Sequence, residues 1–172
     1  MKIKLGIIGI GNIGTMHAKN ILEGKCPEIE LSAVCDINEE KTAWIKESYP
    51  DVSIFNDAEA MMDSGKIDSV LVAVPHYDHP KYAMMSMEKG LHTLVEKPAG
   101  VYTKQVLEMI EVANKCDVKF GLMMNQRTNC IYRKMREIVK SGELGEIKRT
   151  SWIVTDWYRP QFYYDSGDWR AT

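Results

Sequence analysis

The glycine motif GIGNIG at residues 9–14 directly follows an apolar stretch, Ile3 to Ile8, and predicts a strand that turns tightly into a helix. In such a loop Gly9 permits the turn, Gly11 leaves room between the backbone and a pyrophosphate, and Gly14 lets the helix pack closely on the sheet. The anion then lies at the N-terminus of that helix. We interpret the motif as a dinucleotide-binding loop, although a turn that requires positive φ angles can produce the same glycines without a ligand.

A second apolar stretch, Leu31 to Cys35, ends at Asp36, about 20 residues beyond the glycine motif. An acid at this place accepts hydrogen bonds from the ribose hydroxyls of the adenosine half and repels the additional phosphate of NADP. The sequence therefore predicts NAD as the cofactor, with NADP disfavoured. In the alternative interpretation, Asp36 and Asn38 only cap the helix that begins at Glu39. Both interpretations can hold, because Asp36 can bind the ribose while Asn38 caps.

Composition and charge argue against several classes of partner. The 172 residues are 45% hydrophobic and carry a formal net charge of -2, which indicates a globular core and no broad attraction to nucleic acid or to anionic membranes. The four cysteines lack the C-x-x-C spacing of zinc or redox sites. The sequence shows neither a signal peptide nor an apolar span of about 18 residues, so we expect a cytoplasmic protein.

Apolar stretches alternate with segments of helical periodicity along residues 1–124. Strands separated by helices are typical of a parallel sheet. Right-handed crossovers then favour a doubly wound α/β fold, whose ligand lies beyond the carboxyl ends of the strands. The predicted strands are Ile3 to Ile8, Leu31 to Cys35, Ser53 to Phe55, Ser69 to Ala73, His92 to Val95 and Val118 to Met124.

After the last of these strands the pattern changes, and we predict that residues 125–172 begin a second, incomplete α+β domain. The apolar residues between Ile131 and Val139 have the spacing of an amphipathic helix that ends at Gly142. The segment from Ile147 to Tyr158 alternates like a half-buried strand, which needs neighbouring strands that the sequence does not supply. The aromatic segment that follows reaches Thr172 without residues that typically end a helix or strand. We therefore expect the chain to be a truncated form of a longer protein.

The loop after the fourth predicted strand contains His76 and His79, and it faces the cofactor crevice in a doubly wound fold. Two histidines at this spacing could be metal ligands, but the sequence does not clearly indicate a third cysteine, histidine or carboxylate ligand that would complete a site. We therefore predict no metal and assign these histidines to hydrogen bonding or cofactor contact.

Glu96, Lys97 and Pro98 end the fifth predicted strand with an acid, a base and a rigid turn beside the expected nicotinamide. A partly desolvated lysine amine at this place can bind a substrate hydroxyl and stabilise the oxyanion that develops as hydride leaves. We therefore predict Lys97 as the catalytic residue and Glu96 as the group that holds it in place. The alternative is an ordinary surface ion pair ahead of a loop.

Five elements, in this order, resemble the Gfo/Idh/MocA oxidoreductases, and the resemblance extends over essentially the whole chain. It implies a Rossmann domain and an NAD(P)-dependent dehydrogenase that acts on a hydroxyl of a sugar, cyclitol or related polyol. The sequence departs from the family at the loop Val74-Pro75-His76, where Thr-Pro-Asn is common. The five elements are residues 9–14, Asp36, Val74-Pro75-His76 with His79, Glu96-Lys97-Pro98, and Asn125-Gln126-Arg127 followed by the turn at residues 141–145.

By the same resemblance Lys97 is the catalytic lysine, and residues 125–172 begin a substrate-binding and oligomerisation domain. The family's proton-transferring histidine lies further along than Thr172, so we expect the chain by itself to be inactive and the complete protein to be a homo-oligomer. The alternatives are a non-catalytic dinucleotide-binding or sensing module that docks on a partner chain, and an enzyme that retains its NAD(H) between two substrates. The implied cofactor-binding residues are Gly9, Gly11, Asn12, Ile13, Gly14, Asp36, Pro75, His76, His79, Glu96, Asn125 and Arg127, the last of which contacts nicotinamide or substrate.

Overall fold

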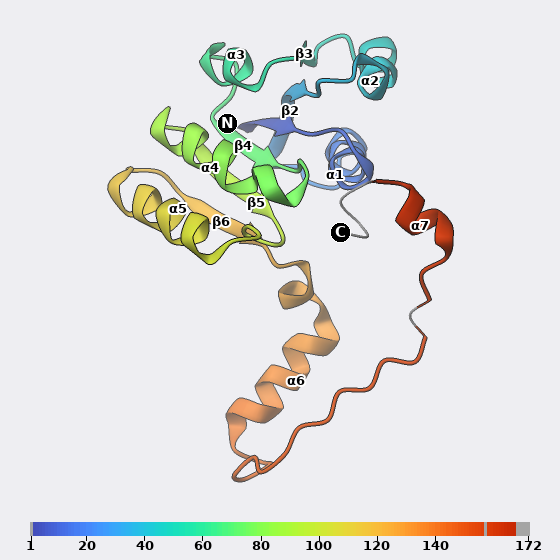
Figure 1. The fold of residues 1–172 in the computed structure, drawn as a ribbon, viewed down its shortest axis with the longest axis vertical. Coiled ribbons are helices and arrows are strands. Elements are labelled where there is room, and N and C mark those ends of the chain that lie inside the picture. Colours follow the sequence, from blue (N-terminus) through green and yellow to red (C-terminus); the bar gives the residue numbers. More distant parts are fainter. Residues whose placement is uncertain (1, 157, 168–172) are drawn as a thin grey trace. The chain divides into compact units, whose positions relative to one another are not determined.

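The computed structural model describes residues 2–156 and 158–167, and the chain divides between Met124 and Asn125 into two compact units (Figure 1). The first unit is an open sheet with helices packed on both of its faces. The described part of the second unit consists of helices and irregular segments.

The first unit is built on a six-stranded parallel sheet in the order β3-β2-β1-β4-β5-β6. The chain adds strands outward from β1 to β3, then returns to the other side of β1 and continues to β6. The predicted doubly wound fold is thereby confirmed, and ligands of such sheets bind where the strand order reverses, beyond the carboxyl ends of the strands. The strands are β1 (Ile3–Ile8), β2 (Ile29–Cys35), β3 (Ser53–Phe55), β4 (Ser69–Val72), β5 (His92–Glu96) and β6 (Phe120–Met123).

Helices connect the successive strands, as parallel pairing requires. Local signals in the sequence mark several of their ends. The side chain of Asp57 accepts a hydrogen bond from the Ala60 N–H at 2.7 Å and so caps α3, and Gly90 follows α4 with a φ of 76°. The helices are α1 (Asn12–Leu22), α2 (Ala43–Ser48), α3 (Ala58–Asp63), α4 (His79–Glu88) and α5 (Thr103–Lys115), with short 3-10 turns η1 (Glu39–Lys41) and η2 (His76–Asp78).

Each face of the sheet has its own hydrophobic core. Successive side chains of a strand point to opposite faces, so Leu71 of β4 belongs to one core while Val70 and Val72 belong to the other. Helices α1 and α2 cover the first face through Ala18 and Ile45, and α3, α4 and α5 cover the second. Because the central strands are buried on both faces, their carboxyl ends form a rigid edge for the loops that follow.

The second unit contains the amphipathic helix that the sequence predicts, α6 (Cys130–Ser141), preceded by the turn η3 (Asn125–Thr128). The side-chain oxygen of Asn129 accepts a hydrogen bond from the Ile131 N–H at 2.9 Å and caps the helix. The helix ends at Gly142, whose φ of 81° is left-handed. A short helix, α7 (Gln161–Asp165), follows later.

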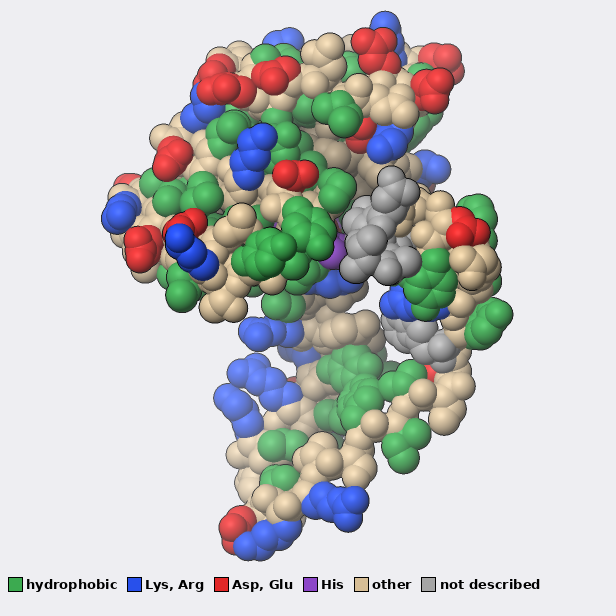
Figure 2. All heavy atoms as spheres, viewed as in Figure 1, with side chains coloured by type: hydrophobic (Ala, Val, Ile, Leu, Met, Phe, Trp, Pro, Cys, Tyr) green, Lys and Arg blue, Asp and Glu red, His purple; other side chains and the backbone are tan. Residues whose placement is uncertain are grey.

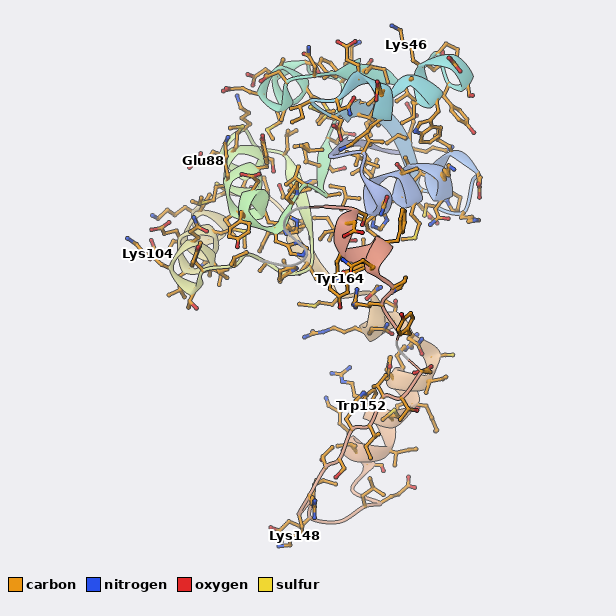
Figure 3. The ribbon with its side chains drawn as sticks, turned by 45° about the vertical axis from the view of Figure 1, so that its right-hand side comes forward. Lys46, Glu88, Lys104, Lys148, Trp152 and Tyr164 are labelled. Carbon is orange, nitrogen blue, oxygen red and sulfur yellow. The ribbon has the colours of Figure 1, made fainter. Side chains whose placement is uncertain are left out.

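The prediction of a strand from Ile147 to Tyr158 is wrong for the described residues of that segment, none of which forms a strand. Trp157 lies outside the described residues. A strand needs a hydrogen-bonded neighbour, and the described part of the second unit holds no other strand that could supply one. Instead, Trp152 lies against Tyr132 of α6, with the ring centroids 5.7 Å apart (Figure 3).

Candidate functional site

The glycine loop after β1 is shaped by two close approaches of the backbone. Gly9 has a φ of 93°, and a Cβ atom placed on it would lie 2.7 Å from the carbonyl oxygen of Ala73, just beyond β4. A Cβ on Gly14 would lie 1.9 Å from the carbonyl oxygen of Gly9. Both positions therefore require glycine: Gly9 for its backbone conformation, and Gly14 because α1 packs directly on the loop.

Gly11 is different, because a Cβ atom there would meet no atom within 4 Å. It stands in extended conformation immediately before α1, and the helix has no side-chain cap at this end. The N–H groups of the first turn lack partners within a helix, and their dipoles favour an anion. Open space beside an uncapped helix N-terminus fits the pyrophosphate of a dinucleotide.

Asp36 lies at the end of β2 with only 8% of its surface exposed. Its Oδ2 accepts a hydrogen bond from the Ile10 N–H at 2.8 Å, and its Oδ1 accepts one from the Asn38 N–H at 2.9 Å. The Lys41 ammonium lies 3.7 Å from the same Oδ1. The carboxylate thus ties the glycine loop to β2, an arrangement that sequence reasoning missed because it concerns a backbone N–H.

The capping role proposed for Asn38 is confirmed. Its side-chain oxygen accepts a hydrogen bond from the Glu40 N–H at 3.0 Å, at the start of η1. Asp36 is therefore not needed as the cap of this turn, and its carboxylate remains at the edge of the sheet.

Glu96 ends β5 and is 6% exposed, whereas the following Lys97 is exposed. The first unit therefore does not supply the partial desolvation of Lys97 that the sequence argument assumed. The Oε2 atom of Glu96 accepts a hydrogen bond from the Lys97 N–H at 3.1 Å, and its Oε1 lies 2.8 Å from Nε2 of His17. Glu96 thus holds the backbone of Lys97 on one side and α1 on the other.

The charge of Glu96 follows from these contacts. Burial raises the pKa of this carboxyl group. The hydrogen bond and charge of His17, together with the N–H and ammonium of Lys97, lower the pKa by more than burial raises it, so the net pKa lies below its ordinary value. The group is therefore ionised at neutral pH and can only accept hydrogen bonds. Consequently His17 Nε2 is the donor of the pair.

His17 is the residue that the sequence analysis missed. The pair with Glu96 spans 79 positions of the sequence, and no local pattern connects the two residues. The available signal was a polar side chain on α1 one helical turn after Gly14, which by itself predicts no partner.

His79, predicted to contact the cofactor, lies in the interior at 1% exposure. Its Nδ1 is 2.6 Å from the carbonyl oxygen of Pro98, and its Nε2 is 2.9 Å from that of Val74. The ring therefore links the loop after β4 to the loop after β5. His76 and Pro75 precede it at η2, with the His76 ring 5.5 Å from the His79 ring.

The predicted site residues of the first unit gather at one edge of the sheet. They lie at or just after the ends of β1, β2, β4 and β5, which are neighbours in the sheet. Side-chain contacts join the segment after β1 to Asp36 and Glu96, and the segment after β4 to the loop after β5. Asn125 and Arg127 belong to η3 of the second unit. The contacts of all these residues with a cofactor stay predictions.

Among the described residues, no group of three or more histidine, cysteine, aspartate or glutamate side chains could hold a metal ion. None of the described helices combines the length and the apolar character needed to cross a membrane.

Burial, with the charges of Asp57 and Asp36, raises the pKa of the Cys35 thiol to about 11, so it stays protonated at neutral pH.

Residues 3–124 match the family model GFO_IDH_MocA, described as an oxidoreductase family with an NAD-binding Rossmann fold. The chain belongs to the Gfo/Idh/MocA oxidoreductase family. The resemblance seen in the sequence is confirmed, and the first unit is an NAD-binding Rossmann domain, as the glycine loop predicts.

Individual relatives agree with this assignment. D-glucoside 3-dehydrogenase of Escherichia coli is 31% identical over 87% of this chain and 42% of its own length. The structure of scyllo-inositol dehydrogenase from Lactobacillus casei with NAD(H) and scyllo-inositol has a TM-score of 0.80, 28% identity, and coverage of 85% of this chain and 43% of that one.

A third similar protein extends the comparison along the chain. The WlbA dehydrogenase of Bordetella pertussis, solved with NADH and UDP-GlcNAcA, has a TM-score of 0.86 and 25% identity over 99% of this chain and 51% of its own. The present chain therefore spans about half the length, or less, of the relatives it matches.

Proposed function

We propose that the protein containing this chain is an NAD-dependent dehydrogenase that transfers a hydride between nicotinamide and a hydroxyl or carbonyl group of a sugar, cyclitol or related polyol. The observation that carries the proposal is the position of Lys97, directly after β5 at the edge of the sheet that also bears the glycine loop and Asp36. The dehydrogenase names of the relatives support the reaction class.

The side chain of Lys97 can donate a hydrogen bond to the hydroxyl or carbonyl oxygen of such a substrate. During oxidation the carbinol C–H bond breaks, its electron pair leaves as hydride for the nicotinamide ring, and the hydroxyl proton passes to an acid–base group as the C=O bond forms. The Lys97 ammonium donates a hydrogen bond to the oxygen while negative charge develops on it. The family resemblance supports an acid–base histidine further along than Thr172.

The loops around Lys97 support a fixed site. Glu96 accepts the Lys97 N–H, and His79 holds the carbonyl of Pro98 immediately after it. A site whose groups are placed before substrate binds avoids reorganisation during reaction. We further propose that residues 125–172 begin the substrate-binding domain, and that the complete protein assembles as a homo-oligomer.

The substitution Lys97→Ala in the full-length protein tests the proposal. We expect kcat to fall by about 100-fold to 1000-fold on a responsive cyclitol or sugar, with the Kd for NAD nearly unchanged, because the lost interaction acts on the transition state. NADH absorbance measures turnover and calorimetric titration measures cofactor binding.

Lys104→Ala is the matched control. Lys104 is a lysine of α5 whose side chain is 89% exposed and points outward (Figure 3), so its loss should leave both kcat and Kd unchanged. A Lys97→Ala protein with the turnover of the unaltered enzyme would remove Lys97 from the reaction.

A further inference from the structure

His17 is the side chain by which α1 reaches the end of β5. The side chain of His17 is 17% exposed, that of its partner Glu96 is 8% exposed, and their Nε2 and Oε1 atoms lie 2.8 Å apart. Helix α1 begins at the glycine loop, and β5 ends one residue before Lys97. The pair therefore connects the element that starts at the pyrophosphate-binding loop with the strand that carries the proposed catalytic lysine.

The two oxygens of Glu96 serve different partners. Oε1 accepts from His17, and Oε2 accepts from the backbone N–H of Lys97 at 3.1 Å. A buried carboxylate that loses a donor is destabilised and must turn toward another group or toward water. Because both oxygens belong to one planar group, such a turn would also withdraw Oε2 from the backbone of Lys97.

Lys97 depends on its backbone for its position. Its side chain is exposed, and a lysine ammonium is a mobile point charge at the end of a flexible four-carbon stem. The backbone contact with Glu96 and the His79 contact with the Pro98 carbonyl restrain the two ends of this short segment. A change at Glu96 would therefore alter where the ammonium group can reach.

We infer that His17 is a positioning residue for Lys97: it holds the Glu96 carboxylate against α1, and Glu96 in turn sets the path of the backbone at Lys97. This inference rests on the proposed function, because it assigns to His17 a share in placing the lysine of that reaction. It extends the active site to a residue outside the Glu96-Lys97-Pro98 signature.

Three substitutions in the full-length protein separate the hydrogen-bond donor from the ring that carries it. His17→Leu removes the donor, His17→Asn keeps an amide on a side chain too short to reach Glu96, and His17→Gln carries an amide nitrogen near the original place of Nε2. Turnover of a responsive cyclitol or sugar, the Kd for NAD and the midpoint of thermal unfolding are measured for each variant.

We expect kcat to fall by about 10-fold to 100-fold in His17→Leu and His17→Asn, because a misplacement of about 1 Å costs up to about 100-fold. His17→Gln should retain turnover within about threefold, and the Kd for NAD should change by less than about threefold in all variants. His17→Asn keeps the inference testable if the leucine variant fails to fold.

A double-mutant cycle with Lys97→Ala distinguishes positioning from general stability. If His17 acts through Lys97, adding His17→Leu to Lys97→Ala should lower the residual turnover no further, whereas an independent structural effect would lower it by the same factor as before.

Several outcomes would overturn the inference. They are unaltered kcat in a folded His17→Leu or His17→Asn protein, an equal loss in His17→Gln, and a full additional loss on the Lys97→Ala background. If Lys97→Ala is impaired and the His17 variants are not, the inference alone fails. If Lys97→Ala keeps full turnover, the proposed function fails and the inference fails with it.

Discussion

Asp36 accepts hydrogen bonds from the backbone N–H groups of Ile10 and Asn38, and it also carries the charge expected to discriminate between cofactors. An alanine at this position would remove both properties at once. Loss of the Ile10 contact would loosen the glycine loop, which would weaken the binding of NAD and NADP alike. Only the ratio of the two affinities therefore reports on the charge.

We expect Asp36→Asn to reduce the preference for NAD over NADP by about 10-fold, because the amide removes the repulsion of the additional phosphate but still accepts a backbone hydrogen bond. Asp36→Ala should reduce the preference similarly and lower both affinities. Calorimetric titration with each cofactor checks this. Asp51→Asn, an exposed charge change, is the control, and an unchanged ratio in Asp36→Asn would contradict the role of Asp36 in cofactor choice.

Residue-scale predictions from sequence succeeded where a local pattern determines the answer. Gly9 and Gly14 are required by positive φ and by close packing, and Asn38 caps the turn that it precedes. Residues that are far apart in the sequence but in contact in the structure show no such local pattern. The His17–Glu96 pair and the two carbonyl partners of His79 depend on which strands become neighbours, so they could be read only from the structure.

At the scale of elements, glycine is required in the glycine loop for two different reasons. Some positions need it for folding, and another leaves space for the proposed ligand. A Cβ on Gly14 collides with the Gly9 carbonyl, whereas a Cβ on Gly11 enters open space beside the N-terminus of α1. Substitutions at these two positions should therefore have different consequences.

Gly14→Ala should lower the free energy of unfolding by about 1–3 kcal/mol or more, because α1 must move away from the loop. Gly11→Ala should leave stability nearly unchanged and weaken NAD binding, because its methyl group occupies the space proposed for the pyrophosphate. Thermal unfolding and calorimetric titration of both variants give the comparison. Equal effects of the two substitutions on stability would contradict it.

The link between α1 and β5 also predicts a dependence on pH. The pKa of Glu96 in the folded chain lies below its ordinary 4.5, so the ionised group stabilises the fold above that pH. The free energy of unfolding should fall as pH drops below 4.5 and through the lower folded pKa.

In His17→Leu a donor that lowers the Glu96 pKa is gone while burial remains, so the folded pKa moves back toward 4.5 or above it and the loss of stability in acid should become smaller. Chemical denaturation across a pH series measures the effect. Glu96→Gln removes the titrating group and is the control; the same pH profile in all three proteins would contradict this account of Glu96.

The predicted strands are all present in the first unit because alternating helices and apolar stretches leave few ways to pair them. The residues from Ile147 to Tyr158 alternate between apolar and polar as in a half-buried strand, yet the described residues of this segment form no strand. Periodicity shows which side chains can share a face, but pairing requires a second strand, and the described part of the second unit has none.

At the scale of the whole molecule, the described part of the second unit presents an exposed apolar face. Figure 2 shows hydrophobic side chains gathered over α6 and the segment that follows it. Ile131, Met135 and Val139 of α6 are 65%, 44% and 54% exposed, and Trp152 is 60% exposed. Such a face is suited to burial against further structure.

We expect the 172-residue chain by itself to bind NAD and to lack dehydrogenase activity, because it spans only about half the length, or less, of the dehydrogenases that it matches. Calorimetric titration and a panel of cyclitols and sugars check the two halves of this prediction. Turnover by purified chain of verified mass would contradict the second half, and absence of NAD binding would contradict the first.

The two partners of the buried His79 ring are carbonyl oxygens, and every amino acid carries one. The tie between the loops after β4 and β5 therefore places no demand on the side chains of Val74 or Pro98. Substitutions at Val74 or Pro98 leave both carbonyl oxygens in place, so the side chains of these two loops can vary without removing the acceptors that face the buried ring.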